Sequence, residues 1–383
     1  MQLLVAALGR APARRLVPSL RCADLDPDSL HDLWFGYRPI DSTAVDPALV
    51  FDSESADGVP ALSAIEHRSL GVLLGKACGD ALGAAGEFLE AEEIVQKWGW
   101  LHSSPSALGA FRYTDDTEMA LALAHSLVDR RLLDGRHCAA TYAAFYADGG
   151  RGYGPSVSSI LKQLHTGELE YRTSGTSQFP SGSYANGGAM RIAPLAVAFH
   201  RASESVLRDA VRVALLPTHV HIDAIESAVA QALLVQALLD SDAAALTDEQ
   251  LGALVESVQA RSLSNELRSK LAIVLSEWRE RIATRASGTT LNADEDDDAP
   301  YPTPPDVLPS DVAVLERLVT PSEFGKRFQI RGTEAMACAC WALLNYWRTP
   351  EEAVVRVVSW GGDADTVGTC HVREMLARHR HQC

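Results

Sequence analysis

Apolar residues recur at helical spacing over most of the chain from about Ser63 onward. A first helix is predicted there, and a second opens at Thr114 and continues through Met119, Leu123 and Leu127. Alanine and leucine are the dominant residues, and both favour helix over strand. We therefore expect a mainly helical protein. The periodicity predicts later helices over residues 189–202, 222–239, 248–258, 266–281, 334–347 and 351–359.

Three stretches interrupt this pattern. Residues 1–60 mix proline, aspartate and serine with little periodicity, so we expect a poorly ordered N-terminal extension to a domain over residues 61–383. Residues 149–188 are rich in Gly, Ser, Thr and Tyr and predict a long loop, which in a compact domain is usually functional. Residues 285–310 combine a run of acidic side chains with several prolines. Because contiguous like charges stay in water, we predict a surface insertion there and no metal site.

Four glycines lie along one face of the first predicted helix, because they recur at every fourth position. Each glycine costs up to about 1 kcal/mol inside a helix, so the stripe needs a structural reason. We favour close approach of another backbone, since the neighbouring apolar residues indicate burial; a weak or broken helix is the alternative. The stripe consists of Gly71, Gly75, Gly79 and Gly83.

The formal net charge of −16 argues against a general nucleic-acid-binding protein, which would carry a basic face. An anionic ligand is still compatible, because bound cations and helix N-termini reverse the local field. The longest apolar runs are shorter than the ~20 residues of a membrane-spanning helix, which predicts a soluble protein. Scattered cysteines without a CxxC pair predict neither a zinc site nor a disulfide framework. We expect a cytoplasmic location, with a mitochondrial one as the alternative because residues 1–23 carry arginines and no acid.

The first candidate site is a cluster of oxygen donors, Thr114, Asp115 and Asp116, at the start of the second predicted helix. One such side chain is enough to cap a helix, and each acid gains less than about 1 kcal/mol from the helix dipole. Adjacent carboxylates repel each other, so keeping them together suggests a bound cation. Asp and Thr oxygens suit Mg²⁺, Mn²⁺ or Ca²⁺ better than zinc. Taken alone, the cluster fits capping and metal binding equally well.

The second candidate cluster follows two glycines that predict a tight turn. It consists of Asp363, Asp365 and Thr366, where a further helix is expected to begin. Alone, this cluster is also an elaborate helix cap or an Asx-turn. Together, the two clusters supply four carboxylates and two hydroxyls, which is enough for a two-metal centre completed by water. The type and number of ligands therefore favour metal binding over capping.

The two clusters belong to a larger set of motifs that resembles the ADP-ribosylglycohydrolase family, which includes the ADP-ribosyl-acceptor hydrolases and dinitrogenase reductase-activating glycohydrolase. The resemblance covers about residues 66–370, and its motifs occur in the family's order. One such motif would be weak evidence, whereas five in order are strong. They are 71–83 (GVLLGKACGDALG) with Glu87-Phe88, 113–119 (YTDDTEM), 182–194 (GSYANGGAMRIAP), Thr218-His219 and 361–366 (GGDADT).

This resemblance implies an all-α fold, a single multi-helix domain with a dinuclear Mg²⁺ centre at the base of an ADP-ribose cleft, with Mn²⁺ as an alternative metal. Glu87 matches an acidic residue near the family's active site, and we expect it to be catalytic together with Asp116 and Asp363. Asp80 lies seven residues before Glu87, and we interpret it as a cap or a hydrogen-bond partner across the glycine stripe. The implied metal ligands are Thr114, Asp115, Asp116, Asp363, Asp365 and Thr366.

The segment 182–188 is predicted to contact a ligand with its backbone. Its glycines let amide groups approach phosphate oxygens, and the helix expected after it directs its positive end at them. In similar proteins this loop binds the diphosphate and distal ribose of ADP-ribose. An Asx-turn for Asn186, a helix-start role for His219 and an ion pair with a helix acid for Arg191 are the structural alternatives. The implied substrate-binding residues are Gly182, Ser183, Tyr184, Asn186, Gly187 and His219.

The C-terminal segment departs from the family pattern. After Thr366 the family continues as a helix of small residues followed by further chain, whereas residues 370–383 here are basic. We therefore expect this helix to be shortened and to support the second cluster poorly.

The resemblance implies Mg²⁺-dependent hydrolysis of the glycosidic bond between ADP-ribose and an acceptor, which reverses ADP-ribosylation. The expected partners are ADP-ribosylated proteins or ADP-ribosyl small molecules, with no direct nucleic-acid or membrane binding. A carboxylate such as Glu87 or Asp363 would take a proton from the attacking water. The alternatives are a non-catalytic descendant that binds ADP-ribose or keeps only the scaffold, and a Mg²⁺-dependent phosphoester hydrolase. The motifs distinguish neither one acceptor linkage from another nor an oligomeric state.

Overall fold

The computed structural model describes residues 63–98, 112–241, 245–286, 308–322 and 326–370. Within these ranges the chain is predominantly helical and contains no strand, only two isolated β-bridges, which pair Glu90 with Gly361 and Ala185 with Arg331. The predicted all-α fold is therefore confirmed. The predicted N-terminal extension, most of the acidic insertion and the basic C-terminal segment lie outside the described residues.

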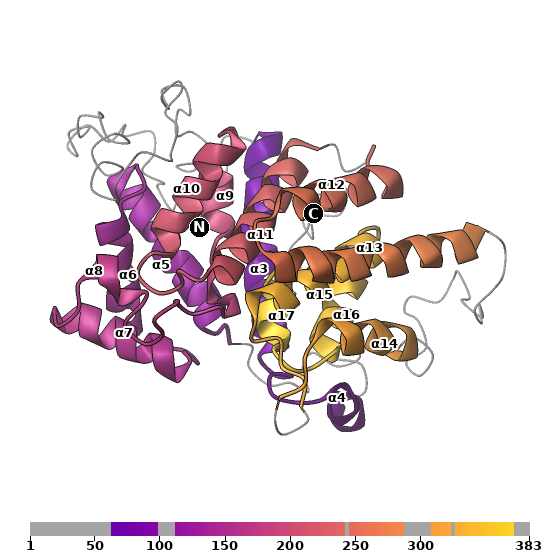
Figure 1. The fold of residues 1–383 in the computed structure, drawn as a ribbon, viewed down its shortest axis with the longest axis horizontal. Coiled ribbons are helices and arrows are strands. Elements are labelled where there is room, and N and C mark those ends of the chain that lie inside the picture. The colour runs from indigo at the N-terminus through magenta and orange to yellow at the C-terminus, as the bar shows by residue number, and fades with distance from the viewer. Residues whose placement is uncertain (1–62, 99–111, 242–244, 287–307, 323–325, 371–383) are drawn as a thin grey trace, which may run out of the picture.

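Figure 1 shows the arrangement of the described helices. In chain order they are α3 (Ala64–Gly83), α4 (Ala91–Trp98), α5 (Asp115–Arg130), α6 (Gly135–Ala147), α7 (Pro155–Thr166), α8 (Tyr171–Ser174), the 3₁₀ turn η5 (Asn186–Gly188), α9 (Ala193–Ala198), α10 (Glu204–Leu215), α11 (Ile222–Asp240), α12 (Asp248–Arg261), α13 (Asn265–Ala286), α14 (Leu308–Leu318), α15 (Gly332–Tyr346), α16 (Pro350–Ser359) and α17 (Ala364–Cys370).

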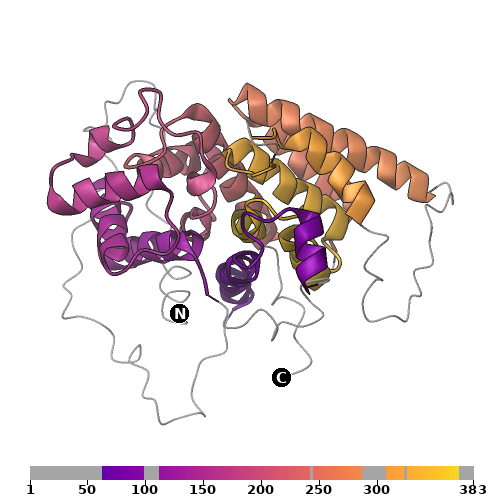
Figure 2. The same cartoon turned by 90° about the horizontal axis from the view of Figure 1, so that it is seen from below.

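Helix α11 lies in the middle of the molecule and packs against α9, α10 and α15. Figures 1 and 2 show α5 to α8 gathered on one side of it and α12 to α16 on the other, with α3 and α17 side by side between them. Among the described helices, α11 alone is long and apolar enough to cross a membrane, but 72% of its apolar window is buried inside the fold. Such burial is typical of a central core helix.

The glycine stripe of α3 has a structural reason at two of its positions. A Cβ atom added to Gly79 would lie 2.3 Å from the carbonyl oxygen of Gly368, and one added to Gly83 would lie 2.4 Å from the Cα of Asp365. Only glycine allows the backbone of α17 to come this close. The predicted close approach of another backbone is therefore confirmed at Gly79 and Gly83, and it seats the short helix α17 directly on α3.

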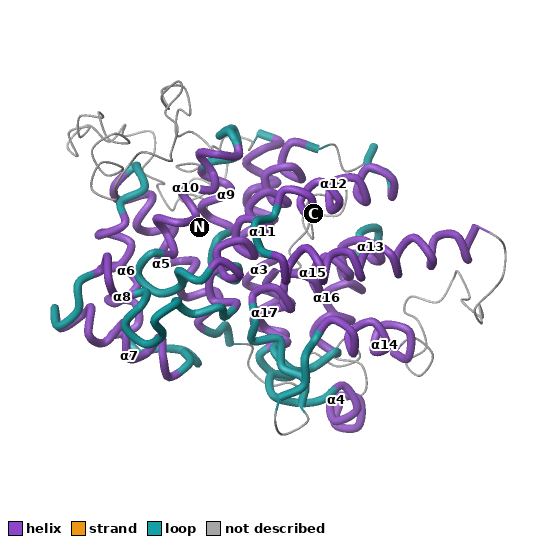
Figure 3. The backbone as a smooth tube through the Cα atoms, in the orientation of Figure 1, coloured by secondary structure: helices purple, strands orange, loops and turns teal. Residues whose placement is uncertain are grey.

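The prediction of a long loop over residues 149–188 is wrong. The segment contains α7, with Pro155 in its first turn, followed by α8 and η5 (Figure 3). Val157, Leu161 and Leu164 recur at helical spacing and contact the hydrophobic core, and Ile160 on the same helix is buried. The surrounding Gly, Ser and Thr residues mask this short apolar face in the composition. The helix predicted over 189–202 is also shorter, because α9 begins only at Ala193 and ends at Ala198.

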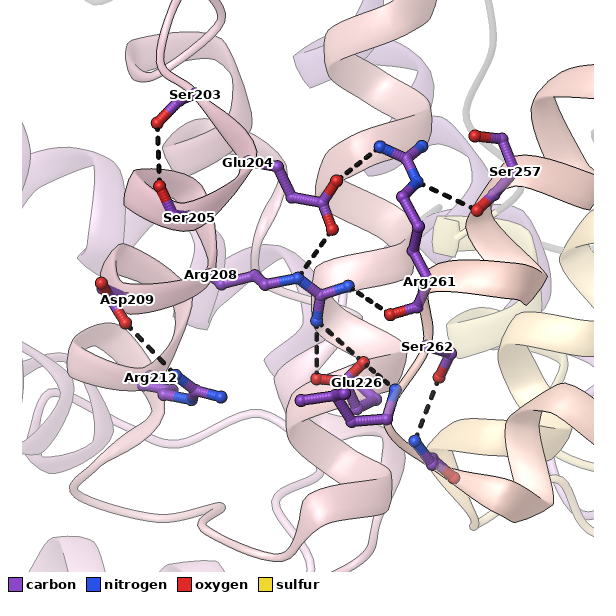
Figure 4. A network of polar contacts seen from close by, with 12 residues as sticks. Ser203, Glu204, Ser205, Arg208, Asp209, Arg212, Glu226, Ser257, Arg261 and Ser262 are labelled. Carbon is purple, nitrogen blue, oxygen red and sulfur yellow. Dashed lines mark hydrogen bonds and ion pairs between the residues drawn. The ribbon is translucent and has the colours of Figure 1, made fainter. Parts of the chain in front are cut away.

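A network of charged side chains fastens α10 to its neighbours (Figure 4). Arg208 of α10 forms ion pairs with Glu204 and with Glu226 of α11, each at 2.8 Å. Its third donor nitrogen bonds to the main-chain oxygen of Arg261 at the end of α12. Glu226 is buried, so this pairing satisfies a carboxylate that would otherwise be very unfavourable inside the protein. The network holds three helices together on the scaffold that carries the site.

Candidate active site

The N-terminus of α5 is capped by a carboxylate that comes from α3. The side chain of Asp80 accepts hydrogen bonds from the backbone nitrogens of Thr114 and Thr117, each at 2.9 Å, and from the Thr114 hydroxyl at 2.8 Å. Thr114 itself is the N-cap residue of α5. The interpretation of Asp80 as a cap is confirmed. Because Asp80 and Thr114 fill the capping role, capping does not account for the carboxylates of Asp115 and Asp116.

The two sequence clusters meet at the carboxylate of Asp116. Its Oδ2 lies 3.3 Å from the hydroxyl of Thr366, a residue 250 positions away in the chain, and 3.5 Å from the hydroxyl of Thr114. Its Oδ1 is buried and has no hydrogen-bond partner among the described residues. The ammonium group of Lys76 lies beneath, but it donates to the main-chain oxygen of Asp116 at 3.0 Å and not to the carboxylate.

A turn of two glycines places the second cluster. Gly361 and Gly362 both have positive φ angles, +73° and +69°, which side chains with a Cβ rarely adopt. After this turn the backbone nitrogen of Asp363 donates to the side-chain oxygen of Gln329 at 2.7 Å. Helix α17 then begins, with Asp365 buried in its first turn. The turn and Gln329 together fix the direction in which the second cluster meets the first.

Burial and mutual repulsion raise the pKa values of the acidic side chains in this site. Burial, followed by the charge of Asp80, raises the pKa of Glu87 to about 7. Burial raises the pKa of Asp115 to about 7, and burial with the charge of Asp116 raises that of Asp363 to about 7. The same causes raise the pKa values of Asp116 and Asp365. A cation bound among these groups would relieve the repulsion.

The donor atoms fit a hard divalent cation. The two clusters offer carboxylate and hydroxyl oxygens, which Mg²⁺ and Mn²⁺ prefer, and the buried Oδ1 of Asp116 has a free acceptor position. Within the described ranges, no group of three or more His, Cys, Asp or Glu side chains already has the arrangement of a metal site. The metal assignment therefore depends on the chemistry of the donors, and it stays a prediction.

The loop 182–188 is fastened to the second cluster. The side-chain amide of Asn186 donates to Oδ2 of Asp363 at 2.7 Å and to the main-chain oxygen of Gln329 at 2.9 Å. The backbone nitrogen of Asn186 donates to the oxygen of Ile330 at 2.9 Å. Asn186 thus connects the loop to a predicted metal ligand. The structural alternative predicted for this residue was an Asx-turn.

The remaining loop residues differ in what they offer to a ligand. Gly182 has a φ of +79°, and an added Cβ would lie 2.5 Å from Val220, so this position requires glycine. Tyr184 is 42% exposed, and the guanidinium of Arg331 lies 4.4 Å from the centre of its ring. The hydroxyl of Ser183 accepts a hydrogen bond from the backbone nitrogen of Ala185 at 3.2 Å. Tyr184 is therefore the loop side chain most available for contact with a ligand.

Comparisons with known proteins identify the family of this chain. Residues 61–370 match the family model described as ADP-ribosylglycohydrolase. The chain belongs to this family. A solved structure titled ADP-ribosylglycohydrolase-related protein complex is similar to this chain with a TM-score of 0.55 and 25% identity, covering 82% of this chain and 88% of the other.

Three curated relatives are similar to this chain over different shares of its length. It is 35% identical to the ADP-ribosylhydrolase ARH3 of Danio rerio over 40% of this chain and 42% of the relative. It is 34% identical to the ADP-ribosyl-[dinitrogen reductase] glycohydrolase of Rhodospirillum rubrum over 35% of this chain and 45% of the relative. These two matches span less than half the length of either relative. A longer match, 26% identical, covers 79% of this chain and 82% of the ARH3 protein of Bos taurus.

Glu87 lies in the turn after α3 of this ADP-ribosylglycohydrolase family member, and its charge contributes to the raised pKa values of Asp115 and Asp363. The next residue, Phe88, has a φ of +64°, which is unusual for a bulky side chain. The backbone nitrogen of Phe88 donates to the oxygen of Gly362 at 2.9 Å. This bond ties the turn that carries Glu87 to the turn that carries the second cluster.

Beneath the loop lies a buried polar group that the motifs only partly indicated. The ring of His219 packs against Gly187, because a Cβ added there would lie 2.7 Å from the ring's Cε1. Arg191 is fully buried and donates to the main-chain oxygen of Gly187 at 2.9 Å and to the hydroxyl of Thr218 at 2.6 Å. Among the described residues Arg191 has no acidic partner, so the predicted alternative of an ion pair with a helix acid is wrong.

Two supporting residues of the site were missed by the sequence analysis. Lys76 lies in the glycine-stripe motif four residues before Asp80, and a lysine on a buried helix face was a signal that could have been used. Gln329 carries no comparable signal. It is recognised only in the fold. There its side-chain oxygen accepts a hydrogen bond from the backbone nitrogen of Asp363, and its main-chain oxygen accepts one from the side-chain amide of Asn186.

Proposed function

We propose that this protein is a divalent-cation-dependent hydrolase, with Mg²⁺ as the first candidate, that cleaves the bond between ADP-ribose and an acceptor. One observation carries the proposal: the Thr366 hydroxyl contacts Asp116 at 3.3 Å. This contact joins two acidic clusters that are 250 residues apart in the sequence. The family's other relatives named in the comparisons are glycohydrolases or hydrolases of ADP-ribosyl groups. The expected substrates are ADP-ribosylated proteins or ADP-ribosyl small molecules.

Each part of the site has a proposed task in this reaction. Bound cations would supply positive charge that orients the ribose hydroxyls and lowers the pKa of a water molecule. The residues proposed to hold them are Thr114, Asp115, Asp116, Asp363, Asp365 and Thr366. The loop 182–188 is proposed to hold the diphosphate through its backbone amides, with Tyr184 at its exposed edge.

Glu87 is the proposed proton acceptor. A general base works best when its pKa lies near the working pH, and burial together with the charge of Asp80 raises the pKa of Glu87 to about 7. Asp363 is a less suitable base, because its Oδ2 already accepts a hydrogen bond from Asn186. We therefore assign Asp363 to metal binding and Glu87 to proton transfer.

The proposal is tested by incubating the full chain with serine-linked and arginine-linked ADP-ribosyl peptides, with Mg²⁺ or with EDTA. We expect free ADP-ribose to appear only with Mg²⁺ and from at least one of the two peptides. Asp365→Ala should abolish release, whereas Asp129→Asn, at the opposite end of α5 from Thr114, should retain it. Full activity of Asp365→Ala would overturn the two-cluster site. Tight binding of ADP-ribose, without release of ADP-ribose from either peptide, would show that the protein is an ADP-ribose-binding protein and not a hydrolase.

A further inference from the structure

Arg191 is a buried cation whose protein partners are all neutral. Its guanidinium donates to the main-chain oxygens of Gly187 and Ala214, the hydroxyl of Thr218 and the sulfur of Met119. No carboxylate pairs with it in the described part of the chain, and its Nε has no hydrogen-bond partner there. Burying such a charge is very unfavourable, so a fold that keeps it without an acid calls for a functional reason.

The hydroxyl of Thr218 connects Arg191 to His219 through two hydrogen bonds. Its oxygen accepts from Nη2 of Arg191 at 2.6 Å and lies 2.8 Å from Nδ1 of His219. A threonine hydroxyl has one proton to donate, and a guanidinium has no acceptor. Within the described residues, His219 Nδ1 is the only acceptor in reach of that proton. The hydroxyl therefore donates to Nδ1, which leaves the ring proton on Nε2.

The other edge of the His219 ring faces the loop 182–188. A Cβ placed on Gly187 would lie 2.7 Å from Cε1 and 2.8 Å from Nε2, but 3.7 Å from Nδ1. The ring is 5% exposed, and burial with the charge of Arg191 lowers the pKa of His219 well below its usual value. The same guanidinium also holds the Gly187 carbonyl, so one cation fixes both the ring and the loop backbone.

We propose that Arg191 and Thr218 are positioning residues that hold His219 as a neutral imidazole with its Nε2–H group presented at the loop 182–188. A neutral N–H donor beside Gly187 suits an oxygen acceptor such as a phosphate or a ribose hydroxyl. This part rests on the proposed function, because it takes ADP-ribose as the ligand of the loop. The role of Arg191 is then to fix the direction of the donor without touching the ligand.

The state of the ring is measured by long-range ¹H–¹⁵N correlation NMR on the ¹⁵N-labelled full chain, with His219→Gln used to identify the His219 signals. At about pH 6, where an ordinary histidine is largely protonated, we expect His219 to be neutral with its proton on Nε2. Thr218→Val removes the bridging hydroxyl and should populate the other tautomer. Thr218→Ser keeps the hydroxyl and should restore the wild-type signals.

Binding of ADP-ribose, measured by calorimetry, supplies the second measurement. Thr218→Val should weaken binding about tenfold, the effect of losing one oriented buried hydrogen bond, and Thr218→Ser should recover most of it. A wild-type ring protonated on Nδ1 or on both nitrogens would overturn the proposal even if every variant failed to fold. Unchanged ring signals in folded Thr218→Val would also overturn it. If wild-type protein bound no ADP-ribose, the proposed function would fail, while the NMR result would still decide the ring state.

Discussion

Asp116 is the residue at which the chemistry of the site is concentrated. Its Oδ2 lies 3.3 Å from the hydroxyl of Thr366 and 3.5 Å from that of Thr114, and its buried Oδ1 has no partner among the described residues. Burial and the charge of Asp365 raise its pKa, so the ionised form is unfavourable in the chain alone. The sequence marked this residue by its acidic neighbours, but its meeting with Thr366 depends on a contact between distant segments.

Asp116→Asn should therefore separate stability from function. The amide has nearly the same volume and removes one charge from a repelling group, so the metal-free variant should be at least as stable as the wild type above about pH 7. It should also lose the increase in melting temperature that Mg²⁺ gives to the wild type, along with turnover. Differential scanning calorimetry with and without Mg²⁺ measures both effects.

The matched control is Asp129→Asn, at the other end of the same helix, which should keep the wild-type response to Mg²⁺. A wild-type response in Asp116→Asn as well would show that its carboxylate is not a metal ligand.

Among the elements, the pair α3 and α17 sets the position of the second cluster. Gly79 and Gly83 on α3 face Gly368 and Asp365 on α17 with no room for a side chain. The stripe of glycines was visible in the sequence, and close packing was its favoured explanation. Its partner was not visible, because α17 has only seven residues and follows an irregular turn. A helix this short is stable only through its tertiary contacts.

Gly83→Ala should destabilise the protein although alanine favours helix by about 1 kcal/mol. The new methyl group would overlap the backbone at Asp365, and overpacking of this kind costs typically 1–3 kcal/mol. Urea unfolding should show the loss, and Mg²⁺ binding should weaken because Asp365 is displaced. Ala77→Gly in the same helix is the propensity control and should lose about 1 kcal/mol without affecting Mg²⁺ binding. A Gly83→Ala variant more stable than the wild type would contradict the close contact.

At the scale of the whole molecule, the site is a concentration of negative charge inside an acidic protein with a formal net charge of −16. Residues from α3, α5, the loop 182–188 and α17 converge on it, and Lys76 is the cation beneath it. Folding brings these carboxylates together at an electrostatic cost. The folded state therefore binds protons, or a cation, more readily than the unfolded chain does.

Stability without metal should decrease as the pH rises from about 4 to about 7. The pKa values of Glu87, Asp115 and Asp363 are raised to about 7 in the folded state, while unfolded carboxyls titrate near 4. In that interval the folded protein holds more protons, so each raised carboxyl lowers the free energy of unfolding as pH increases. Mg²⁺ binds the deprotonated groups, so it should raise the melting temperature more at pH 8 than at pH 5.5. Equal increases at the two pH values would contradict a site made of these carboxylates.

Local information in the sequence determined much of this protein. Helical periodicity located most of the long helices, and the Asp-rich clusters, the glycine stripe and the loop 182–188 followed from residue type and spacing. Several helices escaped this reasoning: α6 and α10 were not predicted, α7 was hidden by its polar surroundings, and α9 was predicted too long. Such elements depend on contacts more than on their own propensity.

Only the tertiary structure decided how these parts work together. It showed that the helix capped by Asp80 is α5, joined Asn186 to Asp363, and placed Arg191 under the loop with no acidic partner among the described residues. These are contacts between segments far apart in the chain, and nothing local encodes them. The distances and burial that set the charge state of each group exist only after the helices have packed.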